Sequence, residues 1–122
     1  MGSAVTESCL EALLARQGQC ALMASILTRT SRMLEAARSS EWSLVVAMEN
    51  KRSQLLKECF AEPVMPENSE IFSEALAIML HMNEELVALL ERAKAEVAAA
   101  TKGQTKIVEN LQHYLAVESS DF

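Results

Sequence analysis

The longest unbroken apolar stripe in the sequence spans residues 72–100. Its members recur at steps of three and four residues: Phe72, Ala75, Met79, Met82, Leu86, Leu89, Ala93, Val97 and Ala100. Such steps place side chains on one face of an α-helix, whereas strands alternate with a period of two. The stripe therefore predicts one long helix over residues 69–101. Leu76, Leu80, Val87 and Leu90 flank the stripe, so this helix has more apolar surface than one neighbouring helix would cover.

Two further stripes precede the long helix. The first predicts a single helix over residues 6–38, with Gly18 as a weak point inside it, and comprises Cys9, Leu13, Cys20, Met23, Leu27, Leu34 and Ala37. The second predicts a helix over residues 41–60 and comprises Val45, Met48, Leu55 and Cys59. Ser39 and Ser40 offer hydroxyls that would cap the start of this helix.

Two breaks define the remaining organisation. Pro63 and Pro66 mark a loop between the second stripe and the long helix. Gly103 is suited to end the long helix, and Thr105 is suited to cap a short last helix over residues 105–116. Because the 122 residues include only 3 Gly and 2 Pro, few other positions interrupt regular structure. The sequence predicts an all-α fold, an antiparallel helical bundle of three longer helices plus a short C-terminal helix, in a single domain over residues 1–122.

Composition and charge exclude several classes of function. The net charge is −6, and Lys and Arg gather on no single face, so we expect no nucleic-acid partner. The longest apolar runs have about 6 residues, whereas a helix that spans a bilayer needs about 20. No basic and apolar leader is visible, which makes the cytoplasm the expected location.

The reactive side chains do not form a recognisable catalytic or metal site. The 3 cysteines are odd in number and widely spaced, which fits buried apolar residues and not a disulfide framework or a zinc site. His81 and His113 lack the paired Glu-x-x-His motifs that bundle metal sites use. We therefore expect no enzyme activity, no catalytic residues, no metal and no cofactor.

Several short motifs occur together in a characteristic order. Leu34-Glu35-Ala36-Ala37 precedes Glu41-Trp42, and Met48-Glu49-x-x-Arg52-x-x-Leu55-Leu56 follows. Downstream come Asn83-Glu84-Glu85-Leu86-x-x-Leu89-Leu90, then Glu96-Val97, Lys102-Gly103 and Tyr114. In this order and spacing the sequence resembles the FliT family of flagellar type III export chaperones over roughly residues 8–116.

The resemblance implies a function and a set of partners. It implies a cytoplasmic chaperone that binds the C-terminal segment of the flagellar filament-cap protein and prevents premature assembly. The chaperone would deliver this client to the type III export apparatus, with contacts to the export ATPase complex and the export gate. It also implies that the short C-terminal helix covers part of the binding surface and moves to regulate access. Some members of the family would in addition contact a flagellar transcription regulator.

Apolar residues of the second predicted helix and of the long helix are the candidate partner-binding residues: Leu44, Met48, Leu55, Leu86, Val87, Leu89, Leu90 and Ala93. The candidate gating face of the short last helix consists of Ile107, Val108, Leu111 and Tyr114. Because apolar stripes at helical spacing are often intramolecular core, core packing is the alternative for each of these residues.

Two alternative functions use the same surfaces. One is a regulatory helical protein that binds a flagellar transcription regulator. The other is a self-associating structural bundle, in which the long stripes pair between copies. A homodimer would also cover the extra apolar surface of the long helix.

Overall fold

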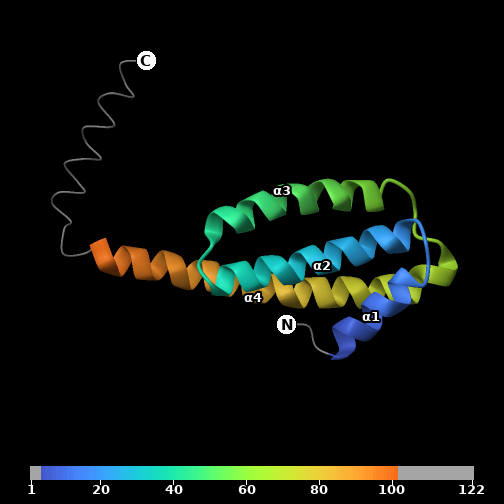
Figure 1. Cartoon of the computed structure of the whole chain (residues 1–122), viewed down its shortest axis with the longest axis horizontal. Coiled ribbons are helices and arrows are strands. Elements are labelled where there is room, and N and C mark those ends of the chain that lie inside the picture. The colour runs from blue at the N-terminus through green and yellow to red at the C-terminus, as the bar shows by residue number, and fades with distance from the viewer. Residues whose placement is uncertain (1–3, 102–122) are drawn as a thin grey trace, which may run out of the picture. The chain divides into compact units, whose positions relative to one another are not determined.

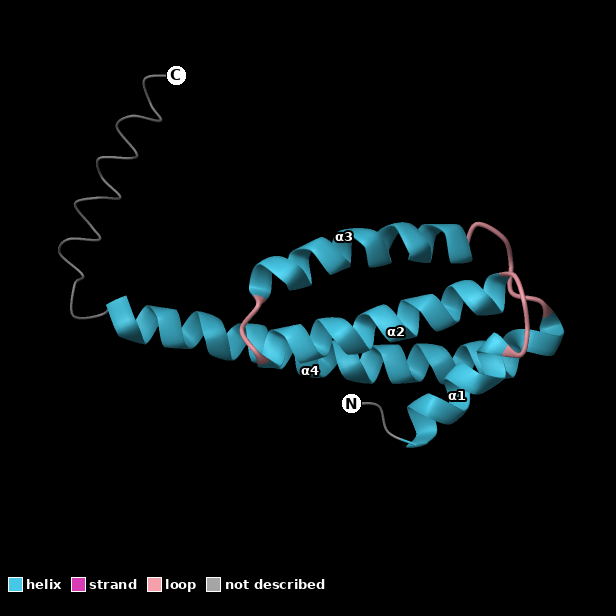
Figure 2. Ribbon diagram, in the orientation of Figure 1, coloured by secondary structure: helices cyan, strands magenta, loops and turns pink. Residues whose placement is uncertain are grey.

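The computed structural model describes residues 4–101, and these residues form helices joined by short connections. Figure 2 shows no strand in this part of the chain. The helices are α1 (Ala4–Leu14), α2 (Gln19–Arg38), α3 (Trp42–Cys59) and α4 (Ser69–Thr101), with a short 3₁₀ helix at Pro66–Asn68. The predicted all-α fold class is confirmed. The long helix begins and ends where its stripe predicts, and α3 differs from its predicted range by one residue at each end.

Contacts divide the chain into two compact units, and the boundary falls inside α4 between Leu90 and Glu91. In the second unit, the last turns of α4 carry an exposed ion pair in which Lys94 Nζ lies 3.5 Å from Glu91 Oε1. Thr101 Oγ1 donates a hydrogen bond of 3.1 Å to the carbonyl of Val97. A single domain over residues 1–122 stays a prediction, and the short helix predicted over residues 105–116 lies outside the described residues.

The first unit contains α1, α2, α3 and α4 as far as Leu90. The chain reverses direction at each connection, so that each helix of this unit runs antiparallel to the one before it (Figure 1). Packed side chains join α2, α3 and this part of α4 along the length of the unit.

The single helix predicted over residues 6–38 is wrong. The chain breaks between Leu14 and Gln19, and Gly18 caps the start of α2 with φ 68° and ψ −124°. Only glycine adopts this conformation without strain, because a Cβ atom disfavours positive φ. Gly18 therefore reverses the chain and does not merely weaken a continuous helix. Its carbonyl accepts hydrogen bonds from the N–H groups of Ala21 at 3.0 Å and Leu22 at 3.2 Å, which begins α2.

The serine caps predicted for the next helix are also wrong. Ser39 ends α2, and its N–H donates to the carbonyls of Glu35 and Ala36. Ser40 adopts a left-handed conformation with φ 59°. The N–H of Glu41 then returns to the carbonyl of Ala36 at 2.9 Å, so the two serines complete the end of α2 in a helix-terminating turn. Glu41 is the residue before α3, and its side chain makes no capping hydrogen bond.

Buried apolar side chains of the first unit form two separate clusters. The first core cluster joins all four helices and consists of Cys9, Leu13, Cys20, Met23, Ala24, Ile26, Leu27, Cys59, Ile71, Phe72 and Ala75. The second core cluster is smaller and consists of Met33, Ala36, Ala37 and Val45, against which Trp42, Met48, Leu86 and Leu89 pack. In α2, α3 and α4 alike, the residues of the two clusters are separated by polar residues.

A polar layer of Thr30, Arg52 and Asn83 lies between the two clusters. Arg52 is only 6% exposed, and its Nη1 donates to Asn83 Oδ1 at 2.8 Å and to Thr30 Oγ1 at 3.2 Å. Its Nη2 pairs with Glu49 on the preceding turn of α3. These contacts offset the cost of burying the guanidinium, although its Nε has no acceptor among the described residues. Because they join α3 to Thr30 of α2 and Asn83 of α4, the layer fixes how the three helices align.

Candidate partner-binding groove

An apolar groove lies between the first half of α3 and the middle of α4. It has a volume of about 340 Å³, which falls in the range of binding cavities. The lining residues are Met33, Trp42, Val45, Val46, Glu49, Asn50, Arg52, Asn83, Leu86, Val87 and Leu90. All of them lie in the first unit. We call this surface the α3–α4 groove.

Helical spacing explains why these residues share one groove. On α3, Val45 and Val46 each lie three or four residues from both Trp42 and Glu49. On α4, Leu86 and Val87 have the same spacing from Asn83 and Leu90. Each helix therefore presents one row of side chains to the space between them. Met33 of α2 is 1% exposed and belongs to the second core cluster, which underlies the groove.

The rim of the groove exposes apolar side chains to solvent. Val46 is 61% exposed, Val87 is 52% exposed and Leu90 is 38% exposed. Single exposed apolar residues are common, but several around one hollow indicate a binding surface. Contact with an apolar partner would remove this area from water, at a gain of about 25 cal/mol for each Å².

One end of the groove is polar. Glu49, Arg52 and Asn83 line it there, and these side chains are hydrogen-bonded to one another through the guanidinium of Arg52. The polar layer thus closes the groove on the side of the first core cluster. A bound segment would meet apolar side chains over most of the groove and polar groups at this end.

The structure brings together only some of the predicted partner-binding residues. Leu86, Val87 and Leu90 line the α3–α4 groove. Leu44 and Met48 line a different hollow, together with Arg32 and Glu35 of α2. Their binding role stays a prediction.

The other predicted site residues lie elsewhere. Leu55 packs against the first core cluster and Leu89 packs against the second, so both contribute to the core. Ala93 belongs to the second unit. The predicted gating residues lie outside the described part of the chain: Ile107, Val108, Leu111 and Tyr114.

The residues of α3 that line the groove were not among the partner-binding residues predicted from the sequence. Trp42, Val45 and Val46 line the groove, but the apolar stripe of α3 did not indicate which of its flanks faces α4. A stripe specifies which residues are buried and leaves open which helix covers them. In the sequence, the valine at position 46 directly after the stripe residue Val45 was the signal that this apolar face is wider than one helix contact requires.

All three cysteines are free and buried. Cys59 is 1% exposed and lies where α3 meets the start of α2, since Gln19 Nε2 donates to the Cys59 carbonyl at 2.8 Å. Burial, with a smaller contribution from the neighbouring Cys20, raises the pKa of the Cys59 thiol from 9.0 to about 11. Burial also raises the pKa of the Cys9 thiol. Raised values make these thiols poor nucleophiles at neutral pH.

We expect the free energy of unfolding to fall as pH rises from 9.0 towards about 11, the two values between which the Cys59 pKa shifts on folding. The folded state holds the thiol proton more tightly than the unfolded state does. The stabilising contribution of the protonated thiol is therefore complete below pH 9.0, the pKa in the unfolded chain, and is lost as the pH rises through about 11, the pKa in the folded protein. The expected loss is about 2 kcal/mol, measured by urea denaturation across this range. Cys59→Ala removes the group and should make the fall less steep, while the raised pKa of Cys9 still contributes. An equally steep fall in the variant would contradict this assignment.

Two further properties concern the described residues alone. Within residues 4–101, no group of three His, Cys, Asp or Glu side chains is arranged to hold a metal ion. Among the helices of the same range, none has the length and apolar content needed to cross a membrane.

Comparison with known proteins identifies the family. No curated protein and no solved structure matches the chain. The sequence model of one protein family, described as flagellar protein FliT, matches residues 20–115 of this chain, which is more than half of its length. The match covers α2 except its first residue, α3, α4 and all residues that line the α3–α4 groove. The chain therefore belongs to the FliT family of flagellar proteins.

Proposed function

We propose that this protein is a cytoplasmic flagellar export chaperone that binds the C-terminal segment of the filament-cap protein in the α3–α4 groove. The family supports a flagellar role. The observation that carries the proposal is the row of exposed Val46, Val87 and Leu90 around one apolar hollow. An apolar groove between two helices suits an amphipathic helix, which inserts side chains that recur every three or four residues.

The chaperone action follows from this mode of binding. A segment whose apolar face lies in the groove cannot use that face for assembly, so premature assembly is prevented. Release to the export ATPase complex and export gate then requires only that the contact be reversible. Groove contacts without a covalent step allow this, because affinity depends on the apolar area buried.

The proposal includes regulation by the short C-terminal helix. An isolated helix of about three turns is marginal in water, so the apolar face of residues 105–116 requires an apolar surface to dock on. If it occupies the groove, the client must displace it, and the apparent affinity is reduced by the fraction of closed chaperone.

Titration calorimetry with the C-terminal segment of the cap protein tests both parts. The full chain is expected to bind, and the chain without residues 104–122 is expected to bind several-fold more tightly. Equal affinity in the two forms would contradict gating but leave the client assignment standing. Absence of binding in both forms, with helical content confirmed by circular dichroism, would overturn the cap-protein assignment.

A further inference from the structure

The guanidinium of Arg52 holds two side chains at the polar end of the α3–α4 groove. Its Nη1 donates to Asn83 Oδ1 at 2.8 Å, and its Nη2 pairs with Glu49 Oε2. Each of these side chains uses one of its two terminal polar atoms in the contact. Asn83 Nδ2 and Glu49 Oε1 therefore remain, and both residues line the groove.

These two remaining atoms are unpaired and reachable from solvent. Within residues 4–101, no hydrogen bond or ion pair engages Asn83 Nδ2 or Glu49 Oε1. Neither atom is among the buried side-chain atoms that lack a partner in this range, which are Arg29 Nε and Arg52 Nε. The side chain of Glu49 is 46% exposed. The polar end thus presents one donor group and one acceptor, which lie close together because a single planar guanidinium orients both side chains.

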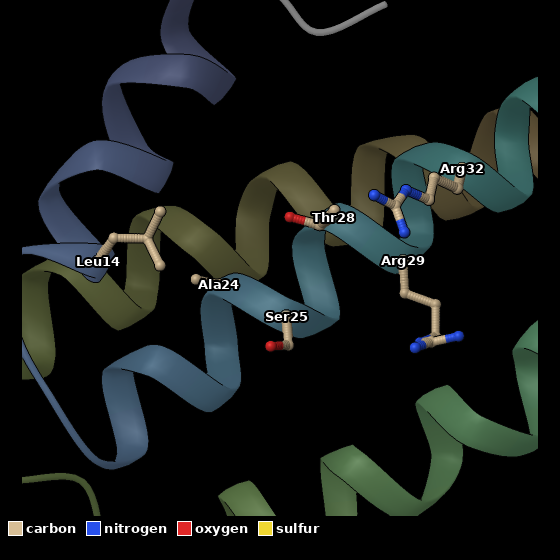
Figure 3. A pocket seen from close by; sticks show the side chains of 6 residues that line it. All are labelled: Leu14, Ala24, Ser25, Thr28, Arg29 and Arg32. Atoms are coloured by element: carbon tan, nitrogen blue, oxygen red, sulfur yellow. The ribbon is translucent and has the colours of Figure 1, made fainter.

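The other buried arginine donor of this range lies at a hollow without such a pair. Arg29 lines a hollow on α2 together with Leu14, Ala24, Ser25, Thr28 and Arg32. Figure 3 shows the side chain of Arg29 extending away from Leu14. Among the described residues, no carboxylate or amide side chain accepts a hydrogen bond from Arg29. The paired polar groups of the groove therefore come from the contacts of Arg52 and not from a buried arginine as such.

The lining of the α3–α4 groove has no net charge. Glu49 and Arg52 are the only ionisable residues among those that line it, and they neutralise each other as an ion pair. A charged client group would leave water for an apolar groove without a counter-charge, which is costly. A primary amide carries a donor and an acceptor on one planar group and has no charge. Its N–H matches Glu49 Oε1, and its oxygen matches Asn83 Nδ2.

We propose that Glu49 and Asn83 select a client segment that carries a glutamine or asparagine side chain at the end of its apolar face. This inference rests on the proposed function, because it concerns the client of the same groove. Asn83 precedes Leu86 and Val87 by about one helical turn on α4. The client amide accordingly lies about one turn beyond the client side chains that contact these two residues. The apolar contacts supply affinity, and the amide fixes the register of the client helix, as single buried amides do in coiled coils.

Titration calorimetry with the full chain and the C-terminal segment of the cap protein tests this selection. Each glutamine of the segment is replaced in turn by methionine, and each asparagine by leucine, which have similar size and no amide. At one position the replacement is expected to weaken binding about tenfold, because it leaves Glu49 and Asn83 unpaired in the complex. At this position, glutamate, aspartate or lysine should weaken binding at least as much, because each brings a charge into the groove.

Asn83→Asp is the corresponding change in the protein. It keeps the oxygen that accepts from Arg52 but replaces the Nδ2 donor by an acceptor. The variant is expected to bind the unaltered segment about tenfold more weakly. It should bind the segment that lacks the selected amide less than about twofold more weakly than the wild type does, because the two changes remove the same contact. In proton–nitrogen correlation spectra of the wild type, the Nδ2–H signals of Asn83 should shift as the unaltered segment is added.

Asn50→Asp is the matched control. Asn50 lines the same groove but makes no contact with Arg52, so the variant adds the same charge without removing the selecting donor. It should change the affinity less than about threefold.

Three outcomes would overturn the selection while leaving the groove as the client site. They are a segment in which no amide replacement weakens binding, equal losses in Asn83→Asp and Asn50→Asp, and a loss in Asn83→Asp that persists with the segment that lacks the amide. Failure of the unaltered segment to bind the folded full chain would instead overturn the proposed function, and this inference with it.

Discussion

Val87→Glu is expected to weaken binding of the cap-protein segment about 30-fold or more. Val87 is 52% exposed at the rim of the α3–α4 groove, so a bound apolar face would bury the new carboxylate without a partner. Burial of an unpaired charge in an apolar contact costs about 2 kcal/mol or more, which corresponds to this loss of affinity. The free energy of unfolding should change by less than about 0.5 kcal/mol, because the side chain faces solvent in the free protein. Calorimetry and urea denaturation measure the two quantities.

Leu80→Glu is the matched control for this experiment. Leu80 also lies on α4 and is 56% exposed, but it does not line the groove. The same charge change at Leu80 should alter the client affinity less than about threefold. Equal losses in the two variants would show that charge alone weakens binding, and an unchanged affinity in Val87→Glu would exclude the groove as the client site.

Arg52→Ala is expected to lower the free energy of unfolding by about 3 kcal/mol. The substitution removes the hydrogen bonds from Arg52 to Thr30 and Asn83 and the ion pair with Glu49. It also leaves a cavity between three helices and a partly buried Asn83 oxygen without its donor, and each effect costs about 1–3 kcal/mol. Part of the loss is offset, because the buried charge no longer requires desolvation. Urea denaturation measures the change.

Two further variants separate the causes. Lys51→Ala removes an exposed cation from the same turn of α3 and should change stability by less than about 0.5 kcal/mol. Arg52→Met keeps most of the side-chain volume, so its stability should lie between those of the wild type and Arg52→Ala. If Arg52→Ala is as stable as Lys51→Ala, the polar layer contributes nothing measurable and our account of helix alignment is wrong.

Much of the helical pattern could be predicted from spacing alone. The stripe from Phe72 to Ala100 has no polar interruption, and the helix that it predicts agrees with α4. The stripe of residues 9–37 was equally periodic but belongs to two antiparallel helices. The spacing of apolar residues shows no sign of the break between α1 and α2, because both helices bury their apolar residues in the first core cluster. The positive φ at Gly18 was the decisive feature, and a glycine in sequence does not reveal its φ.

The groove was predicted only on the α4 side. Leu86 belongs to the long stripe, and Val87 and Leu90 were identifiable as surplus apolar residues on its flank. Which residues of α3 lie across the groove from them depends on how α3 is rotated about its axis. That rotation is set by the polar layer. Arg52 and Thr30 interrupt the apolar stripes of their helices, and Asn83 lies beside the stripe of α4. An assumption that these three polar residues contact one another would have aligned the three helices. The sequence alone does not show that they do.

The polar layer has a further consequence for local opening of the first unit. The first core cluster has 11 buried residues and the second has 4, and the layer interrupts apolar contact between them. Cooperative units in proteins follow continuous apolar packing, so the two ends of the unit differ in their local stability. We therefore expect the end that carries the α3–α4 groove to open at a lower free energy than the end that holds Gln19 and Cys59. Such opening would widen the groove while the other end stays folded.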